Sequence, residues 1–187
     1  TGKPLIISIG LCNEEEISDA LKTARSAGAK DIILLQCNSV YPAKDDEANL
    51  ITIPALMGKY GVLVGYSDHT LGTVSSVAAC ALGACVIEKH VIDSPKPETA
   101  DSAFSLPPDK LKTLVADCHT AWHARGQIRH GPTPSELDSL AFRRSLYVTE
   151  DMNAGDAFTG QTVRSIRPGH GLAPKHLANI LGCRSTR

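Results

Sequence analysis

The chain has 187 residues, of which 42% are apolar and 21% charged, a globular composition that excludes wholesale disorder. Lysine and arginine total 19 and aspartate and glutamate total 20, so the net charge of −1 gives no basic excess for nucleic acid. No apolar run approaches the ~18 residues of a membrane span, and the first residues do not form a signal peptide. We therefore expect a cytoplasmic protein that binds neither nucleic acid nor membrane.

Strands and helices are predicted to alternate over residues 1–126. Short apolar runs predict buried strands at 5–10, 32–35, 62–65 and 85–87. A helix is expected after each strand, at 13–28, 51–59, 73–82 and 108–126, with Asn13 as the first cap and Pro108 opening the last. Four such units predict a parallel α/β sheet with crossover helices, which is either half of an eight-stranded barrel or a small open sheet.

The rest of the chain has a different pattern. Residues 127–140 contain Gly, Pro and Ser and are interpreted as a linker. For residues 141–187 we predict a small β-rich module, with strands at 145–148 and 163–166 on either side of a turn at 151–156. Six scattered cysteines without a CxxC pair favour buried thiols in a reducing compartment over a disulfide framework.

Polar residues cluster directly after the predicted strands, where parallel α/β folds place their ligand sites. His69 and His90 follow the third and fourth strands and together suit a divalent ion such as Mn²⁺, Fe²⁺, Co²⁺ or Zn²⁺. Glu88 and Asp101 could add oxygen ligands or act as acid and base. The alternative is that each histidine only forms a hydrogen bond near a strand end.

Two lysines also lie near strand ends. Lys3 and Lys89 could each meet a phosphate or carboxylate, or could be ordinary solvated lysines. The hydrogen-bonding side chains that would accompany them are Ser8, Asn38, Ser39 and Ser67. His119 and His123 lie four residues apart on the last helix, but without a third ligand they are interpreted as a solvated pair.

Four stretches resemble the sialic acid synthase family in order and spacing: KPLIIS at 3–8, QCNSVYP at 36–42, GYSDHTLG at 65–72 and ALGACVIEKH at 81–90. Within that family, DSAFSL at 101–106, FRRSL at 142–146 and VRSIRPG at 163–169 are most similar to the pseudaminic acid synthase branch. The resemblance covers essentially the whole chain.

The resemblance implies a TIM-type barrel followed by a small antifreeze-like (SAF) domain. Residues 1–126 would be the second half of the barrel, from its fifth strand, and residues 141–187 an incomplete antifreeze-like domain. His69 and His90 match the family's metal ligands. The residues that match or lie beside substrate contacts are Lys3, Ser8, Ser39 and Ser67 for phosphoenolpyruvate, Tyr41 and Asp101 for the sugar, and Arg167, which in the family reaches a partner subunit's site.

The implied reaction is the metal-dependent condensation of phosphoenolpyruvate with 2,4-diacetamido-2,4,6-trideoxy-altrose, in a homodimer with swapped antifreeze-like domains. Mn²⁺ is the expected ion, with Mg²⁺ or Co²⁺ as alternatives, and Glu88 is the candidate for proton transfer or water positioning. N-acetylneuraminate or legionaminate synthesis is an alternative within the enzyme class. An inactive fragment or a sugar- or metal-binding assembly module is an alternative of another class.

Overall fold

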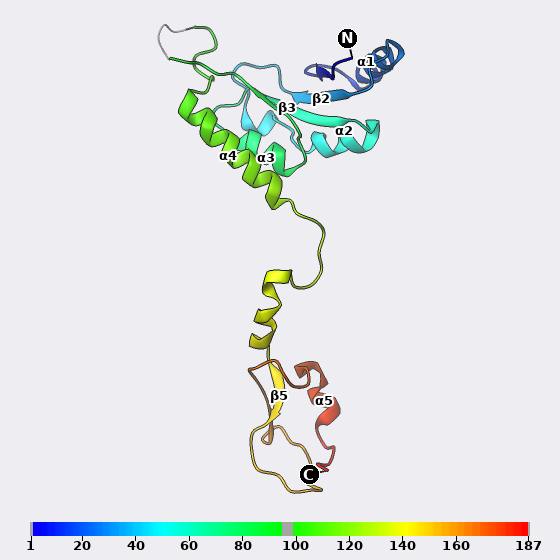
Figure 1. The fold of residues 1–187 in the computed structure, drawn as a ribbon, viewed down its shortest axis with the longest axis vertical. Coiled ribbons are helices and arrows are strands. Elements are labelled where there is room, and N and C mark those ends of the chain that lie inside the picture. The colour runs from blue at the N-terminus through cyan, green and yellow to red at the C-terminus, as the bar shows by residue number, and fades with distance from the viewer. Residues whose placement is uncertain (1, 95–98, 187) are drawn as a thin grey trace. The chain divides into compact units, whose positions relative to one another are not determined.

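Helices and parallel strands alternate through the first 124 residues, as the apolar runs predict. The computed structural model describes residues 2–94 and 99–186. Its first elements are β1 (Leu5–Ser8), α1 (Glu14–Ser26), β2 (Ile32–Cys37), α2 (Thr52–Tyr60), β3 (Leu63–Asp68), α3 (Val74–Ala81), β4 (Ile87–Lys89) and α4 (Pro108–Ala124) (Figure 1). Each predicted strand and helix of this region is present, with bounds that differ by a few residues.

The four strands form one sheet in the order β1-β2-β3-β4, and every pair is parallel. Each strand is joined to the next by a connection that contains a helix, as parallel neighbours require. In register, Cys37 lies opposite Ser67, and Ser67 lies opposite Glu88. The fold is therefore α/β, four β/α units that make up half of a TIM-type barrel.

Local signals in the sequence set the ends of the helices. Asn13 and Glu16 form a capping box at the start of α1, because each side chain accepts a hydrogen bond from the other residue's backbone N–H, at 3.0 and 2.8 Å. Gly61, with φ of 60°, ends α2 in the left-handed conformation that favours glycine. Pro108 opens α4 at a position where its missing N–H costs nothing.

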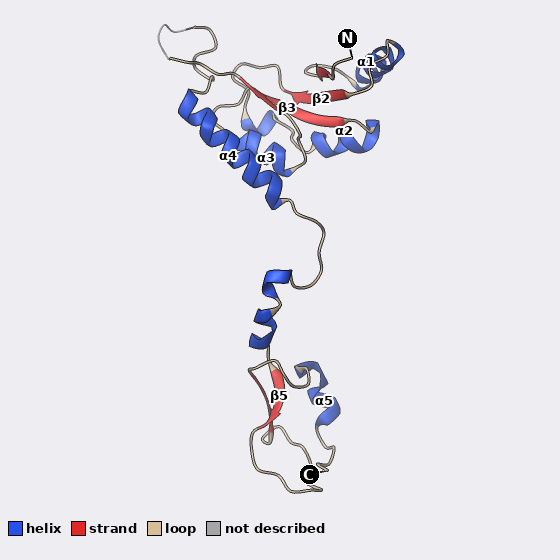
Figure 2. Cartoon of the chain, viewed as in Figure 1, coloured by secondary structure: helices blue, strands red, loops and turns tan. Residues whose placement is uncertain are grey.

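The core lies between the sheet and the helices, on what would be the outside of a barrel. Ile17 and Leu21 from α1, together with Ile53 from α2, pack against buried strand residues such as Leu34 and Val64. Figures 1 and 2 show α2, α3 and α4 on the same side of the sheet. This apolar contact holds the strands in register and so positions the residues at their carboxyl ends.

The opposite face of the sheet, which would line the inside of a barrel, is largely open. Among the described residues no helix covers this inner face, and its apolar side chains Ile6 and Leu63 are 49% and 56% exposed. The prediction of four buried strands is therefore wrong for β1 and β4, which have no fully buried residue. The physical reason is that each is an edge strand with only one neighbour, next to an uncovered face.

A groove lies between the outer side of β4 and two helices that pack on that side, α3 and α4. Its lining includes Ile87 and Lys89 from β4, and Leu114 and Trp122 from α4. Trp122 is 44% exposed and carries the Arg125 guanidinium 4.6 Å from its ring centroid. The groove is thus apolar at its base and open to solvent along α4.

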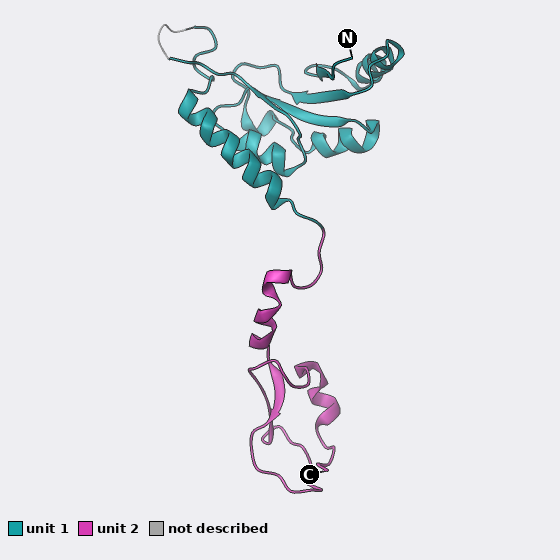
Figure 3. Cartoon of the chain, in the orientation of Figure 1, with its two compact units in different colours: residues 1–127 teal, residues 128–187 magenta. Residues whose placement is uncertain are grey.

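The chain divides into two compact units, residues 1–127 and 128–187, which Figure 3 colours separately. The second unit contains β5 (Ser145–Val148) antiparallel to β6 (Val163–Ile166), and the short helix α5 (Leu177–Ile180). The predicted linker differs in detail, because 3₁₀ turns occupy Pro134–Glu136 and Asp138–Phe142. Both predicted strands are confirmed, whereas the identity of this unit as an antifreeze-like domain stays a prediction.

All six cysteines lie in the described part of the chain and are free thiols. The expectation that they are buried is wrong for Cys12, Cys85 and Cys183, which are exposed. Burial, reinforced by the neighbouring Cys80, raises the pKa of Cys118 to about 12. Over residues 2–94 and 99–186, no helix combines the length and the apolar character needed to cross a bilayer.

Candidate active site

Strand alternation separates the carboxyl ends of β3 and β4 into two sets of side chains. Ser67 and His69 lie two residues apart, as do Glu88 and His90, so each pair projects from the inner face. Asp68 and Lys89 lie between them and project outward. Because Ser67 and Glu88 are register partners, the sheet brings the four inner side chains to one place.

The His69 imidazole is held from two directions. It is 6% exposed, and its Nδ1 lies 2.9 Å from the Asn38 carbonyl oxygen and 3.8 Å from the Cys37 Sγ. The His69 carbonyl in turn accepts the Ala43 N–H at 2.9 Å, so the loop after β2 is tied to the end of β3. This ring is a fixed element of the site.

The two histidines lie side by side, among aromatic rings. Their ring centroids are 5.3 Å apart, and Tyr41 lies 4.1 Å from His69 and 6.0 Å from His90. Phe104 packs edge-on against His90 at 5.0 Å. The Asp101 carboxylate lies 3.6 Å from His90 Nδ1, beyond hydrogen-bond distance but close enough to attract a protonated ring. The backbone N–H of Leu106 donates to the His90 carbonyl and keeps this segment in place.

Glu88 and Ser67 form a hydrogen-bonded pair beside the imidazoles. Ser67 Oγ donates to Glu88 Oε1 at 2.6 Å. Glu88 is exposed on the open inner face, whereas Ser67 is buried. One carboxylate oxygen is therefore oriented by the serine, and the group as a whole can exchange protons with a molecule on that face.

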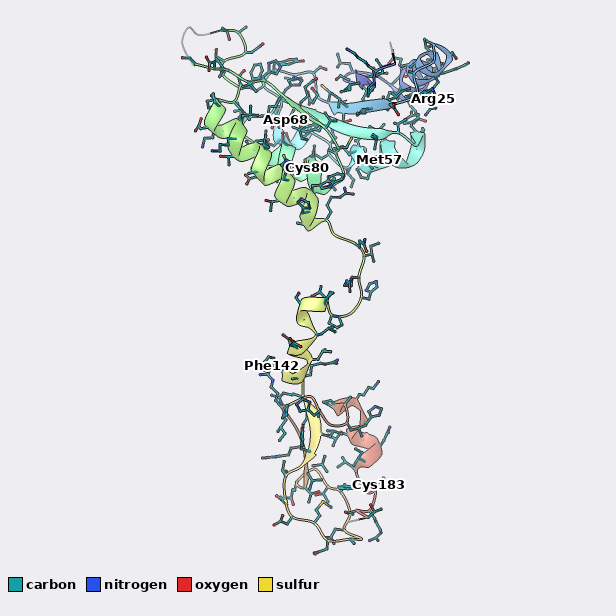
Figure 4. All side chains as sticks on the ribbon, viewed as in Figure 1. Arg25, Met57, Asp68, Cys80, Phe142 and Cys183 are labelled. Carbon is teal, nitrogen blue, oxygen red and sulfur yellow. The ribbon has the colours of Figure 1, made fainter. Side chains whose placement is uncertain are left out.

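Lys89 is not available to a substrate, so its candidacy as a phosphate or carboxylate ligand is wrong. Its Nζ lies 2.9 Å from Asp68 Oδ2 and donates to the Thr70 carbonyl at 2.8 Å, with side-chain exposures of 2% and 0% for Lys89 and Asp68. Asp68, which Figure 4 labels, also accepts hydrogen bonds from Thr70 and from Ser76, a residue of α3. Lys89 is buried because side chains alternate along β4, which turns Lys89 toward the helices. The buried Asp68 carboxylate also affects Tyr66, because burial and the Asp68 charge both raise the pKa of Tyr66.

The remaining predicted substrate contacts are more scattered. Ser39 is half-buried beside Gly10, where a Cβ would collide with Ser39 Oγ, so the loops after β1 and β2 meet there. Ser8 ends β1 on the inner face, opposite Leu35. Lys3 precedes β1 and therefore lies at the amino end of the sheet, away from this cluster. Arg167 is exposed in the second unit, directly after β6.

The spacing of the His69 and His90 rings is compatible with two imidazoles that share one divalent ion. Imidazole nitrogens bind such ions at about 2.0–2.1 Å, which puts the centroids of two rings that share one ion roughly 5 Å apart. The observed spacing is 5.3 Å. Within residues 2–94 and 99–186, no cluster of three or more His, Cys, Asp or Glu side chains has metal-binding geometry. Any ion held here would take only two ligands from this cluster.

Two contributors to the site were not found from the sequence. Phe104 forms a wall against His90 and Tyr41, although only the segment around it drew attention through its resemblance. The Asn38 carbonyl fixes His69, whereas the sequence pointed only to the Asn38 side chain. Period-two alternation would have separated Lys89 from Glu88 and His90, but backbone carbonyl contacts leave no signal in residue type.

A parallel half-barrel with imidazole, carboxylate and hydroxyl groups at the carboxyl ends of its strands defines the class, a TIM-barrel-type fold with a candidate ligand site at that edge. The NeuB family profile matches residues 1–130. The chain belongs to the NeuB family.

Curated relatives agree with this assignment. The chain is 37% identical to the pseudaminic acid synthase of Helicobacter pylori, over all of this chain and 55% of that protein. It is 35% identical to the N,N'-diacetyllegionaminic acid synthase of Legionella pneumophila, over 97% of this chain and 52% of the relative. The chain spans about half the length of the curated relatives it matches.

Solved structures place the same fold in proteins of this kind. The N-acetylneuraminic acid synthetase of Leptospira borgpetersenii, crystallised with citrate, matches with a TM-score of 0.67 and 32% identity. That match covers 72% of this chain and 47% of the other. A putative spore coat polysaccharide biosynthesis protein E of Chromobacterium violaceum matches with a TM-score of 0.66 and 26% identity, over 94% of this chain and 54% of the other.

Proposed function

We propose that this chain carries catalytic residues of a nonulosonate synthase of the pseudaminic acid type. The substrates are phosphoenolpyruvate and 2,4-diacetamido-2,4,6-trideoxy-altrose. The observation that carries the proposal is the convergence of Glu88, Ser67, His69 and His90 on one face, in a chain 37% identical to pseudaminic acid synthases.

His69 and His90 would hold a divalent ion, with Mn²⁺ as the first candidate and Mg²⁺ or Co²⁺ as alternatives. When bound, the ion supplies Lewis-acid polarisation of the aldehyde oxygen of the open-chain sugar. Tyr41 and Asp101 lie near His90, and we assign to them the orientation of the sugar by hydrogen bonds. Ser8, Ser39 and Ser67 are the candidate contacts for phosphoenolpyruvate at this edge, and the position of Lys3 before β1 gives no support for its part.

The bond changes of the reaction define what Glu88 must do. C3 of phosphoenolpyruvate bonds to the aldehyde carbon, and the hydroxyl of a water adds at C2. The water's other proton goes to the former aldehyde oxygen, a transfer that Glu88 can mediate while Ser67 holds its Oε1. The C2–O bond to phosphate then breaks, C2 becomes a ketone, and phosphate leaves with the proton of the added hydroxyl.

We propose that Arg167 acts across a dimer interface. An exposed arginine forms strong, often bidentate, hydrogen bonds to carboxylates and can orient a charged or polar substrate. We place it in the site of a second subunit of a homodimer with swapped second units, each unit being an antifreeze-like domain. The resemblance of VRSIRPG at 163–169 supports this placement.

Phosphate release from phosphoenolpyruvate tests the proposal. We expect release from the purified chain that requires both Mn²⁺ and the altrose derivative. Glu88→Gln keeps an acceptor for Ser67 but not the charge, and should lower the rate by at least about 100-fold. Preference for N-acetylmannosamine or for the legionaminate precursor would instead assign the chain to another branch of the family.

The exposed inner face and edge strands favour one further candidate, a sugar- or metal-binding assembly module without turnover. A folded chain that binds Mn²⁺ through His69 but releases no phosphate with any of these sugars would support this second function. A folded chain that binds neither Mn²⁺ nor any of these sugars and releases no phosphate would contradict both.

A further inference from the structure

The His69 imidazole has only one neutral form that fits its surroundings. A carbonyl oxygen can only accept a hydrogen bond, so the 2.9 Å contact with the Asn38 carbonyl requires a proton on His69 Nδ1. In the neutral ring the lone pair then lies on Nε2. Metal-bound histidines commonly donate their other N–H to a carbonyl in this way, which fixes the ring and its tautomer.

The Asn38 carbonyl is itself held in place by the Asn38 side chain. Its Oδ1 accepts the Val40 N–H at 3.0 Å, and its Nδ2 donates to the Glu47 carbonyl at 3.3 Å. The first bond is an Asx turn, which fixes the backbone just after β2. The second ties that turn to the 3₁₀ segment Asp45–Glu47. One side chain therefore sets the direction of the carbonyl that His69 meets.

We propose that Asn38 is a positioning residue that locks His69 in the Nδ1–H tautomer and leaves Nε2 free as a ligand. The inference rests on the proposed function only in taking Nε2 as a metal ligand. The locked tautomer follows from the contacts alone and exists in the metal-free protein. Asn38 acts through His69 and needs no contact with substrate.

Asn49 provides a matched control. Its Nδ2 donates to the same Glu47 carbonyl at 3.0 Å, yet no hydrogen bond links Asn49 to His69 in the described part of the chain. Its φ of 47° is left-handed, so Asn49→Gly removes the side-chain bond without backbone strain. Asn38→Ala removes both loop bonds, whereas Asn38→Asp keeps the acceptor for Val40.

The experiment is long-range ¹H–¹⁵N correlation NMR on the metal-free chain with ¹⁵N-labelled histidine, at alkaline pH. The chain has seven histidines, and the signals lost in His69→Gln identify His69. We expect a single Nδ1–H form for His69 in the unaltered chain, in Asn49→Gly and in Asn38→Asp, and a mixture of tautomers in Asn38→Ala. An Nε2–H form in the unaltered chain, or an unchanged tautomer in a folded Asn38→Ala chain, would overturn the inference.

Mn²⁺ titration gives the second readout. Asn38→Ala should raise the dissociation constant roughly 10- to 100-fold, the usual effect of losing an outer-shell partner, while Asn49→Gly leaves it near the original value. If Asn38→Ala fails to fold, an Nε2–H form or a tautomer mixture of His69 in the unaltered chain or in Asn38→Asp still overturns the inference. An unaltered chain with the Nδ1–H form that binds no Mn²⁺, together with a tautomer mixture in Asn38→Ala, contradicts the metal role in the proposed function but supports the lock by Asn38.

Discussion

At the scale of single residues, the two imidazoles at the ends of β3 and β4 define the candidate metal site. We expect His69→Ala and His90→Ala each to abolish stoichiometric Mn²⁺ binding, because a two-ligand site cannot lose one imidazole and retain affinity. His119→Ala is the control, since His119 is exposed on α4. Elemental analysis after dialysis measures the bound metal, and full occupancy in either site variant would remove that histidine from the site.

How far single residues could be predicted from the sequence depends on what carries each role. His69, His90, Glu88 and Ser67 were all named as candidates, because side-chain type and position at the end of a predicted strand are visible in the sequence. Lys89 shows the limit of residue type alone, since a lysine beside two site residues points to the other face. The Asn38 contact could not be anticipated, because any residue has a carbonyl.

At the scale of elements, the buried Asp68–Lys89 pair joins the ends of β3 and β4 directly behind the histidines. Lys89→Met leaves the Asp68 carboxylate buried without its cation, and should destabilise the first unit by about 3–5 kcal/mol. Lys59→Met is the matched control. Its partner Glu14 and Lys59 itself are both solvent-exposed, so at most about 1 kcal/mol is expected. Denaturant melts of the two variants measure the difference, and equal losses would contradict a special role for the buried pair.

The inner face of the sheet offers a test of strand packing. A Cβ at Gly65 would lie 2.5 Å from the Val86 carbonyl and 2.6 Å from Leu35 Cδ2, so Gly65→Ala should cost roughly 1–3 kcal/mol. Gly58 lies inside α2 with nothing within 4 Å of such a Cβ. Gly58→Ala should therefore stabilise the unit by roughly 0.5–1 kcal/mol. Thermal melts should shift in opposite directions, and an unchanged or higher melting temperature for Gly65→Ala would show that Leu35 and the Val86 carbonyl both move aside.

The elements themselves were largely predictable, and the reason is local. The Asn13–Glu16 capping box, Gly61 and Pro108 mark helix ends in the sequence, and each does so in the structure. The burial of β1 and β4 was not predictable from their apolar residues, because burial depends on what covers a strand. An apolar run indicates that a strand tends to be buried. Its position at the edge of the sheet decides whether other elements cover it.

At the scale of the whole molecule, β1 and β4 each have one unpaired edge within the described part of the first unit, and the inner face is open. The chain matches 55% of the Helicobacter pylori pseudaminic acid synthase. We expect the part of that relative which the chain does not match, supplied as a separate polypeptide, to bind β1 and β4, raise the melting temperature and increase phosphate release. Unchanged melting and activity with an excess of a folded partner would contradict this expectation. An alternative explanation, nonspecific crowding, is controlled by an equal mass of an unrelated protein.

Trp122 gives this half-barrel an optical consequence. It is the single tryptophan of the chain and lines the groove between β4 and α4, with 44% of its surface in water. Indole emission depends on the polarity around the ring, and a guanidinium lies over it at 4.6 Å. Any polypeptide that pairs with β4 and fills that groove would exclude water from the indole ring and shift its fluorescence to shorter wavelength. Trp122 is therefore an intrinsic fluorescent reporter of this groove, and binding of a polypeptide there can be followed without an added label.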